Sequence, residues 1–160
     1  MKKVKILDFE ISNSSPLVLI AGPCMLESRD HALMMADKIK RLADKYKLKL
    51  IYKTSFDKAN RTSINSKRGL GIEKSLKIFE EIKSEFNCPV ITDVHNESHC
   101  ELVSNVVDII QIPAFLCRQT DLLIAASKTN KVINIKKGQF LSPYEVGKII
   151  EKIESFNNTK

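Results

Sequence analysis

The chain has 160 residues, 43% hydrophobic and 28% charged, which are values typical of one folded domain with a substantial core. Its net charge of +7 permits nucleic acid, an acidic membrane surface or small anions as partners. The absence of any basic run of five residues, together with 6% aromatics, argues against a nucleic-acid surface. No apolar run approaches the ~20 residues of a membrane span, and the first residues lack the apolar stretch of a signal peptide.

The four cysteines do not form a C-x-x-C pair, so neither a zinc ribbon nor a thioredoxin motif is expected. We therefore expect free, mostly buried thiols in a reducing compartment, and a cytoplasmic protein without a membrane segment.

The predicted elements alternate between strands and helices along the whole chain. Alternating residues over 4–11 predict a short strand or hairpin arm. Continuous or alternating apolar runs then predict five strands, at 17–21, 48–52, 90–92, 108–112 and 132–135. The first of these has the pattern of a strand buried on both faces.

A helix is expected after each of the five strands. The first begins near Ser28, with an apolar face at Ala32, Ala36, Ile39, Ala43 and Tyr46. The others are expected over 72–86, around 102–106, after a cap at Thr120, and after the capping box of residues 142–145. The tail, 157–160, is predicted to be polar and frayed.

Five consecutive βα units in a single domain, residues 1–160, require a parallel sheet with right-handed crossovers. Two α/β architectures fit this pattern. One is an open doubly wound sheet of the flavodoxin type, which length alone favours. The other is the first five units of a (β/α)8 TIM barrel, which needs ~250 residues when complete.

A dense polar loop follows the second strand, in the stretch LKLIYKTSFDKANRTS at 48–63. Lys53, Lys58 and Arg61, with short hydrogen-bonding side chains between them, suit one or two phosphorylated ligands. The alternative is a solvated surface loop that is basic.

Each predicted strand ends in a residue with chemical capacity. The set is Cys24, Lys53, Asp93 with His95, Gln111, and Lys136. Because the carboxyl ends of parallel strands lie on one face, we expect these side chains to converge. Each residue considered alone also has a structural explanation. Cys24 could fill space in the core, His95 could form a hydrogen bond within a loop, and the two lysines could extend into solvent. Gln111 interrupts an apolar strand, and a buried amide needs partners.

Five blocks of sequence carry a resemblance to a known family. They are AGPCMLES (21–28), KTSFDKANRTS (53–63), ITDVH (91–95), DIIQIPAFLCRQTDLL (108–123) and INIKKGQF (133–140). From about Val4 to Ile153 the chain resembles the N-terminal part of 3-deoxy-D-manno-octulosonate 8-phosphate synthase. A related synthase that starts aromatic amino-acid synthesis shares the GPC strand end but lacks the loop at 58–63.

The resemblance implies a TIM-barrel homotetramer that condenses phosphoenolpyruvate with D-arabinose 5-phosphate, releasing phosphate, for lipopolysaccharide assembly. It implies that Lys53, Lys58 and Gln111 hold the carboxylate side of phosphoenolpyruvate. It assigns the phosphate of phosphoenolpyruvate to Lys136 and the Ala114 backbone N–H, and the sugar phosphate to Asn60, Arg61 and Thr62. Phe115 and Arg118 would reach a neighbouring subunit's site, and Asp93 and His95 would line the reaction centre.

The resemblance also implies a divalent metal, because metal-dependent members have a cysteine where this chain has Cys24. A thiolate ligand suits zinc, iron or cobalt. The remaining ligands of the family, a His, a Glu and an Asp, belong to about three βα units that this sequence lacks. We therefore expect either a second polypeptide that supplies the missing C-terminal half or a truncated remnant with little activity. A non-catalytic module that binds a phosphorylated ligand, and a basic nucleic-acid binder, are the alternatives from other classes.

Overall fold

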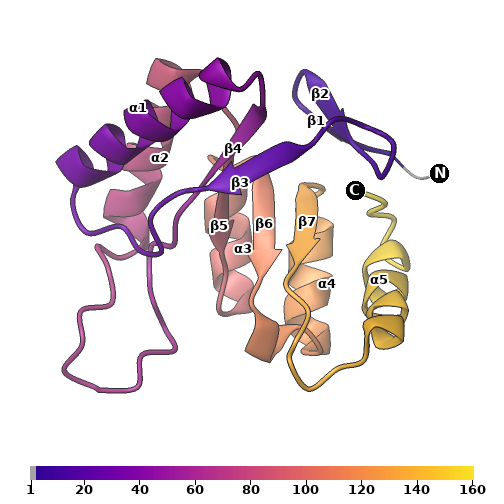
Figure 1. The fold of residues 1–160 in the computed structure, drawn as a ribbon. Helices are drawn as coiled ribbons and strands as arrows, with labels where there is room; N and C mark the ends of the chain where they lie inside the picture. The colour runs from indigo at the N-terminus through magenta and orange to yellow at the C-terminus, as the bar shows by residue number, and fades with distance from the viewer. Residues whose placement is uncertain (1–2) are drawn as a thin grey trace. The chain divides into compact units, whose positions relative to one another are not determined.

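The computed structural model describes residues 3–160, which form two compact units that meet in sequence between Thr92 and Asp93 (Figure 1). Strands and helices alternate in both units and the strands that follow the hairpin pair in parallel, which confirms the α/β class. No helix in the described part of the chain is both long and apolar enough to cross a membrane.

The first unit begins with the predicted hairpin, in which β1 (Val4–Ile6) pairs antiparallel with β2 (Phe9–Ile11). It continues through β3 (Val18–Ala21), α1 (Arg29–Lys45), β4 (Lys49–Lys53), α2 (Ile72–Phe86) and β5 (Val90–Asp93), whose last residue, Asp93, already belongs to the second unit. β4 pairs in parallel with β3 on one side and β5 on the other. A flavodoxin-type sheet would instead place its first strand between the second and third. The sequential order is that of a barrel, so the preference from length for an open sheet is wrong.

Helix α1 begins as predicted, because the Ser28 hydroxyl accepts the backbone N–H of His31 at 3.1 Å. Its buried face is made of Ala32, Ala36 and Ala43, and their small side chains let the helix lie close to the sheet. The prediction that Tyr46 belongs to this face is wrong. The helix ends at Lys45, and Tyr46 is the C-cap residue with 65% of its surface exposed.

Strand β3 is less buried than its apolar sequence predicts. Ile20 is 42% exposed and the preceding Leu17 is 73% exposed, so burial on both faces is wrong for this strand. Within the described residues β3 pairs only with β4, and it therefore lacks a second neighbouring strand that would cover its side chains. By contrast, β4 is buried from Leu50 to Tyr52, and the Tyr52 hydroxyl donates to the carbonyl of Ala32 at 3.1 Å.

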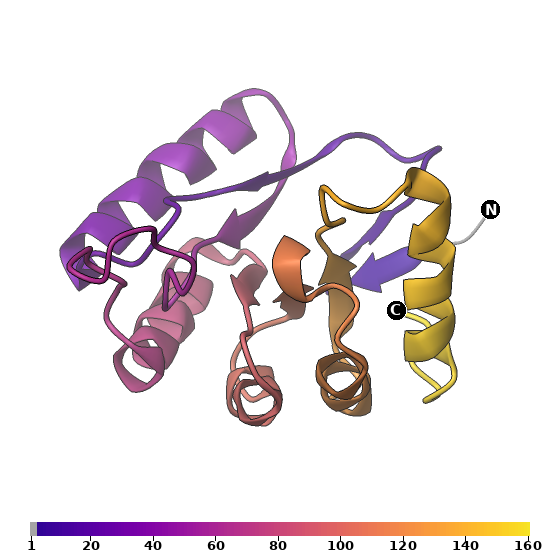
Figure 2. The ribbon, with the colours of Figure 1, turned by 90° about the horizontal axis from the view of Figure 1, so that it is seen from below.

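The second unit contains α3 (Glu97–Ser104), β6 (Ile109–Ile112), α4 (Thr120–Lys128), β7 (Val132–Ile135) and α5 (Val146–Glu154). Short 3-10 turns precede α4 and α5, at η1 (Ala114–Leu116) and η2 (Pro143–Glu145). β6 and β7 are parallel, with Gln111 opposite Asn134. Figure 2 shows the three helices following one another beside these strands, and α4 packs against both α3 and α5.

Two predictions for this unit need correction. The N-cap of α4 is Gln119, and Thr120 is the first helical residue, whose hydroxyl accepts from Lys152 at 2.8 Å. The tail is not frayed. Asn158 is 1% exposed, and its amide nitrogen donates to the carbonyls of Ser127 (3.2 Å) and Lys131 (2.9 Å). The polar side chain that indicated solvent exposure is thus a buried donor to two backbone carbonyls.

Candidate functional site

The ends of β3 and β4 are held together by a close approach of their backbones. A Cβ on Gly22 would lie 1.9 Å from the carbonyl oxygen of Lys53, so only glycine fits where the chain leaves β3. Beyond this point the backbone N–H of Leu26 donates to Ser55 at 2.9 Å. The turn that carries Cys24 is therefore fixed beside the first residues of the polar loop.

Four side chains form what we call the cation cluster: Cys24, Lys53, Lys58 and Arg61. The thiol of Cys24 is exposed and hydrogen-bonds with Lys58, which lowers the pKa of the thiol below its ordinary value of 9.0. Partial burial opposes this shift, and the positive charges of Lys53 and Arg61 add to it. The cluster thus combines a thiol that ionises readily with three cations, an environment that favours anions.

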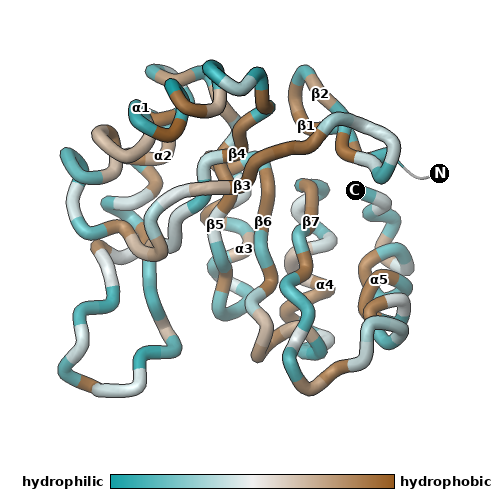
Figure 3. The backbone as a smooth tube through the Cα atoms, in the orientation of Figure 1, coloured by the Kyte–Doolittle hydropathy of each residue, from teal (hydrophilic) through white to brown (hydrophobic). Residues whose placement is uncertain are grey.

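The loop between β4 and α2 is long, without helix or strand, and mostly hydrophilic (Figures 1 and 3). Its base is closed by backbone hydrogen bonds from Lys58 to Arg68 (2.6 Å) and from Gly71 to Phe56 (3.2 Å). The Arg68 guanidinium also forms an ion pair with Asp57, in which its Nε donates at 2.8 Å. These contacts hold the loop in place at its base, although it has no secondary structure.

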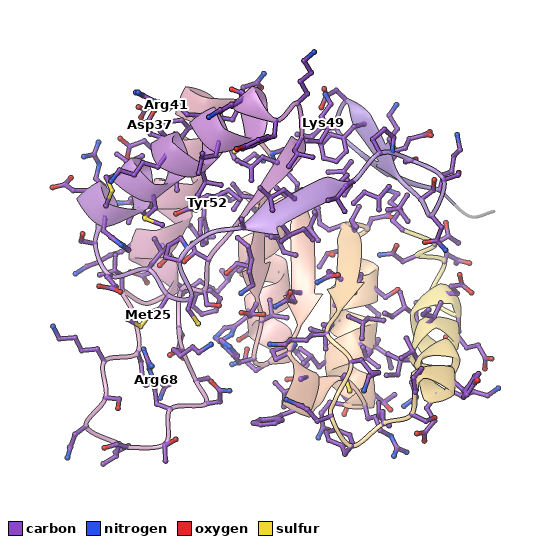
Figure 4. The ribbon with its side chains drawn as sticks, viewed as in Figure 1. Met25, Asp37, Arg41, Lys49, Tyr52 and Arg68 are labelled. Atoms are coloured by element: carbon purple, nitrogen blue, oxygen red, sulfur yellow. The ribbon has the colours of Figure 1, made fainter. Side chains whose placement is uncertain are left out.

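Arg61 lies across the loop rather than free in solvent. Its Nε donates to the carbonyl of Lys67 at 3.0 Å, and its Nη2 lies 3.5 Å from the sulfur of Met25. Figure 4 shows that Met25, in the turn after β3, lies near Arg68 of the loop. The two other residues predicted to bind the sugar phosphate, Asn60 and Thr62, are exposed on the same loop.

In the second unit, three side chains form what we call the amide cluster: Asp93, Gln111 and Asn134. Gln111 is only 7% exposed, and its nitrogen donates to the carboxylate of Asp93. Its oxygen accepts from the amide nitrogen of Asn134 at 2.8 Å. The partners that a buried amide requires are thus supplied by Asp93 and Asn134, neither of which was predicted from the sequence as a partner of Gln111.

The turns after β6 and β7 lie close together. The backbone N–H of Lys136 donates to Ile112 at 3.0 Å, and a Cβ on Gly138 would lie 3.0 Å from the carbonyl oxygen of Ala114. The Lys136 side chain is exposed, whereas Ala114 is 7% exposed. These two predicted phosphate-binding residues therefore share one end of the β6–β7 pair.

The other predicted residues of this unit lie around helix starts. The backbone N–H of His95 donates to Nδ1 of His99 at 3.3 Å, and the two rings are edge-to-face with centroids 5.9 Å apart. Phe115 in η1 is 62% exposed, and Arg118 is exposed just beyond it. The exposure of these last two side chains leaves them accessible to a partner.

The structure thus brings six of the predicted residues into two groups, one in each unit. Cys24, Lys53, Lys58 and Arg61 belong to the first, and Asp93 and Gln111 to the second. Asn134 and the Asp57–Arg68 pair are additions that sequence reasoning missed. A signal for Asn134 was present, because it interrupts the apolar strand Val-Ile-Asn-Ile just as Gln111 interrupts Ile-Ile-Gln-Ile.

The surroundings of Cys24 do not make a complete metal site. Over residues 3–160 no group of three or more His, Cys, Asp or Glu side chains is arranged to hold a metal ion. Catalytic metals such as zinc take three protein ligands, and the neighbours of Cys24 in the cation cluster are positively charged. The described residues therefore offer Cys24 as a thiolate ligand but do not form a three-ligand site around it.

Comparison with known proteins confirms the resemblance. Residues 3–160 match the profile of the DAHP synthetase I family. The chain is 60% identical over 157 residues to a 2-dehydro-3-deoxyphosphooctonate aldolase of Rickettsia typhi, which covers 98% of the chain. The proteins of the same name from Rickettsia felis and Bartonella tribocorum are 57% and 54% identical, over 97% and 98% of the chain.

The chain spans 57% of the length of the two Rickettsia relatives and 56% of that from Bartonella. The matched range runs from the hairpin through α5, and the residues of the cation cluster and the amide cluster lie within it. The chain therefore belongs to the DAHP synthetase I family.

Proposed function

We propose that this chain carries the substrate-binding residues of a 3-deoxy-D-manno-octulosonate 8-phosphate synthase, which the relatives' name, 2-dehydro-3-deoxyphosphooctonate aldolase, also denotes. The reaction joins phosphoenolpyruvate, D-arabinose 5-phosphate and water, and releases inorganic phosphate. The observation that carries the proposal is the cation cluster, in which Lys58 contacts Cys24 beside Lys53 and Arg61. The relatives' name favours this reaction over that of the related synthase of aromatic amino-acid synthesis.

The charges of the proposed binding residues suit these substrates. Two phosphate monoesters carry about −1.5 to −2 each, and a carboxylate adds one more negative charge. Five cations are available to balance them: Lys53, Lys58, Arg61, Arg118 and Lys136. In this assignment, Lys53, Lys58 and Gln111 bind the carboxylate side of phosphoenolpyruvate, and Lys136 with the Ala114 N–H binds its phosphate. Asn60, Arg61 and Thr62 bind the sugar phosphate.

The chemistry follows from bringing two anions together. The enol carbon of phosphoenolpyruvate attacks the aldehyde carbon, so positive character develops at C2 and negative charge on the aldehyde oxygen. Water adds at C2, and the adduct expels phosphate with cleavage of the C–O bond. Cations and oriented donors cancel the repulsion between substrates and stabilise the alkoxide. Positioning alone can contribute up to about 7–11 kcal/mol in the most favourable cases. Asp93 and His95 line this reaction centre.

We assign Cys24 as one thiolate ligand of a divalent metal of the zinc, iron or cobalt class. When bound, such a metal would supply a positive charge beside the substrates. The described residues do not complete the ligand set of such a metal.

Three further assignments complete the proposal. The protein acts in the cytoplasm, in the synthesis of the lipopolysaccharide sugar. It assembles as a homo-oligomer, a tetramer in the resembled family, in which Phe115 and Arg118 contribute to a neighbouring subunit's site. Their exposure supports an intermolecular role.

Equilibrium binding of phosphoenolpyruvate to the chain tests the proposal. Lys58→Met should weaken binding about tenfold or more, because it removes a charge-assisted contact. Lys77→Met, on the exposed face of α2, makes the same change in net charge and should leave binding unchanged. Equal affinities of these two variants would contradict the assigned site.

Phosphate release from phosphoenolpyruvate, measured with and without arabinose 5-phosphate and divalent metal, separates catalysis from binding. Release that requires arabinose 5-phosphate supports the synthase. Binding without release, even after metal is added, would favour the non-catalytic module.

A further inference from the structure

The chemistry of the three side chains in the amide cluster determines which of them donate and which accept hydrogen bonds. A carboxylate only accepts hydrogen bonds, so Asp93 requires the nitrogen of Gln111 to face it. The oxygen of Gln111 then faces β7, and the residue opposite must donate. Asn134 is the cross-strand partner of Gln111 in the parallel pair and donates to that oxygen at 2.8 Å.

The same arrangement leaves a donor for a ligand. The nitrogen of Gln111 carries two N–H groups, and Asp93 accepts one of them. The second N–H remains available to an incoming acceptor, and a carboxylate is the acceptor that the proposed function assigns to this side chain. An amide rotated by half a turn would present its oxygen there instead and would repel a carboxylate.

We propose that Asn134 is a positioning residue, which holds the Gln111 amide with its nitrogen toward Asp93 so that Gln111 can bind the carboxylate of phosphoenolpyruvate. This inference rests on the proposed function and adds a residue to it. Asn134 does not itself touch the substrate in this scheme. It acts by fixing one of the two orientations that a glutamine amide can adopt at nearly equal cost in shape.

Comparing two ligands, phosphoenolpyruvate and inorganic phosphate, separates a positioning role of Asn134 from a general role in stabilising the fold. Asn134→Asp keeps the shape of the side chain but places an acceptor against the oxygen of Gln111, so the present orientation of the amide loses its preference over the turned one. We expect this variant to bind phosphoenolpyruvate about tenfold more weakly. Inorganic phosphate, which has no carboxylate, should lose much less affinity, by the amount that the added negative charge alone causes. Asn13→Asp, at an exposed turn residue, is the control with the same change in charge.

A second variant tests the order of the hydrogen bonds directly. Combining Asp93→Asn with Asn134→Asp reverses every donor and acceptor, so the chain of hydrogen bonds can form again with the Gln111 amide turned. We expect the double variant to regain the thermal stability that Asn134→Asp loses. The side-chain ¹H–¹⁵N resonances of Gln111 should be restored to a hydrogen-bonded pattern at new shifts.

The outcomes distinguish the inference from the proposed function. If the unmodified chain binds phosphoenolpyruvate and Asn134→Asp binds it equally well, Asn134 has no positioning role. Equal losses for phosphoenolpyruvate and phosphate would show a structural role and would also overturn the inference. If the unmodified chain binds neither ligand, the proposed function fails and the substrate role of Asn134 fails with it. The recovery of stability in the double variant would then still report whether the direction of the hydrogen bonds is correct.

Discussion

At Gly22 a single hydrogen atom in place of a side chain permits β3 and β4 to end side by side. Replacing it with alanine would place a methyl group 1.9 Å from the Lys53 carbonyl oxygen, and a backbone atom cannot move aside as a side chain can. We expect Gly22→Ala to lower the free energy of unfolding by at least about 2 kcal/mol. Urea denaturation would measure this change.

The matched control is Gly147, in α5, where an added Cβ meets nothing within 4 Å. Gly147→Ala should raise stability by about 0.5–1 kcal/mol, because alanine favours the helix. A Gly22→Ala variant as stable as the unmodified chain would show that the two strand ends need not approach so closely.

Cys24 should be the most reactive thiol of the protein. Lys58 favours the thiolate and lowers the pKa of Cys24, whereas burial raises the pKa of Cys100 to about 12. The pH profile of alkylation should therefore have a midpoint below 9.0 at Cys24, and Lys58→Met should move it upward. Mass spectrometry after brief iodoacetamide treatment would follow both cysteines.

The same lowered pKa of Cys24 determines how the stability of the fold changes with pH. Because the folded pKa of Cys24 is lowered, its thiolate stabilises the fold above the unfolded pKa, and this contribution is lost as pH falls through the folded pKa. An alkylation midpoint that Lys58→Met leaves unmoved would contradict the contact.

At the scale of the elements, the conformation of the loop after β4 depends on a small number of contacts at its base. Arg68→Ala removes the ion pair with Asp57, and Lys67→Ala is a control because the contact of Lys67 with Arg61 uses the backbone carbonyl. We expect faster hydrogen exchange over residues 58–66 in Arg68→Ala only. Global stability should change by less than about 1 kcal/mol, since exposed ion pairs contribute little. Equal exchange in both variants would mean that the backbone hydrogen bonds alone close the loop.

The elements themselves could be predicted because their signals are local. Residue pattern and capping chemistry correctly predict three features: the start of α1 after Ser28, the end of α2 at Phe86, and the strand over 132–135. Burial could not be predicted in the same way. The continuous apolar run at β3 predicts a strand that is buried on both faces. Burial, however, depends on the neighbouring strands and helices, which the sequence of the run does not specify. The tail was misjudged for the same reason, since Asn158 is polar and yet donates to two backbone carbonyls.

The candidate site could be predicted at its strand ends but not in its connections. Parallel strands deliver their last residues to one edge, and this rule predicted the proximity of Cys24 to Lys53 in the first unit and of Asp93 to Gln111 in the second. Which side chains contact one another depends on register and loop path. Asn134 can be recognised as a partner of Gln111 only once the β6–β7 register is known. Arg68 pairs with Asp57, which lies eleven positions earlier in an irregular stretch of the chain.

For the whole molecule, the balance of charge and exposed apolar surface governs solubility. A net charge of +7 opposes self-association. Ile20 in β3 and Leu17 just before it expose apolar surface, and β3 pairs with β4 alone among the described strands. Added salt screens the charge, so light scattering should rise between low and high ionic strength. Leu17→Lys should suppress this rise more than Leu42→Lys, an equal change on the surface of α1. Equal suppression would assign the effect to charge rather than to β3.

The closed base of the loop after β4 has one more consequence, for engineering. Lys58 and Arg68 meet through a backbone hydrogen bond of 2.6 Å, so the nine residues between them leave and rejoin the scaffold at nearly one point. Such a segment behaves as an interchangeable cassette. On the proposed function, transplanting the corresponding stretch from a relative that uses another sugar phosphate, with both anchors retained, should change which sugar phosphate binds, as equilibrium binding would show, while the strands beneath stay undisturbed.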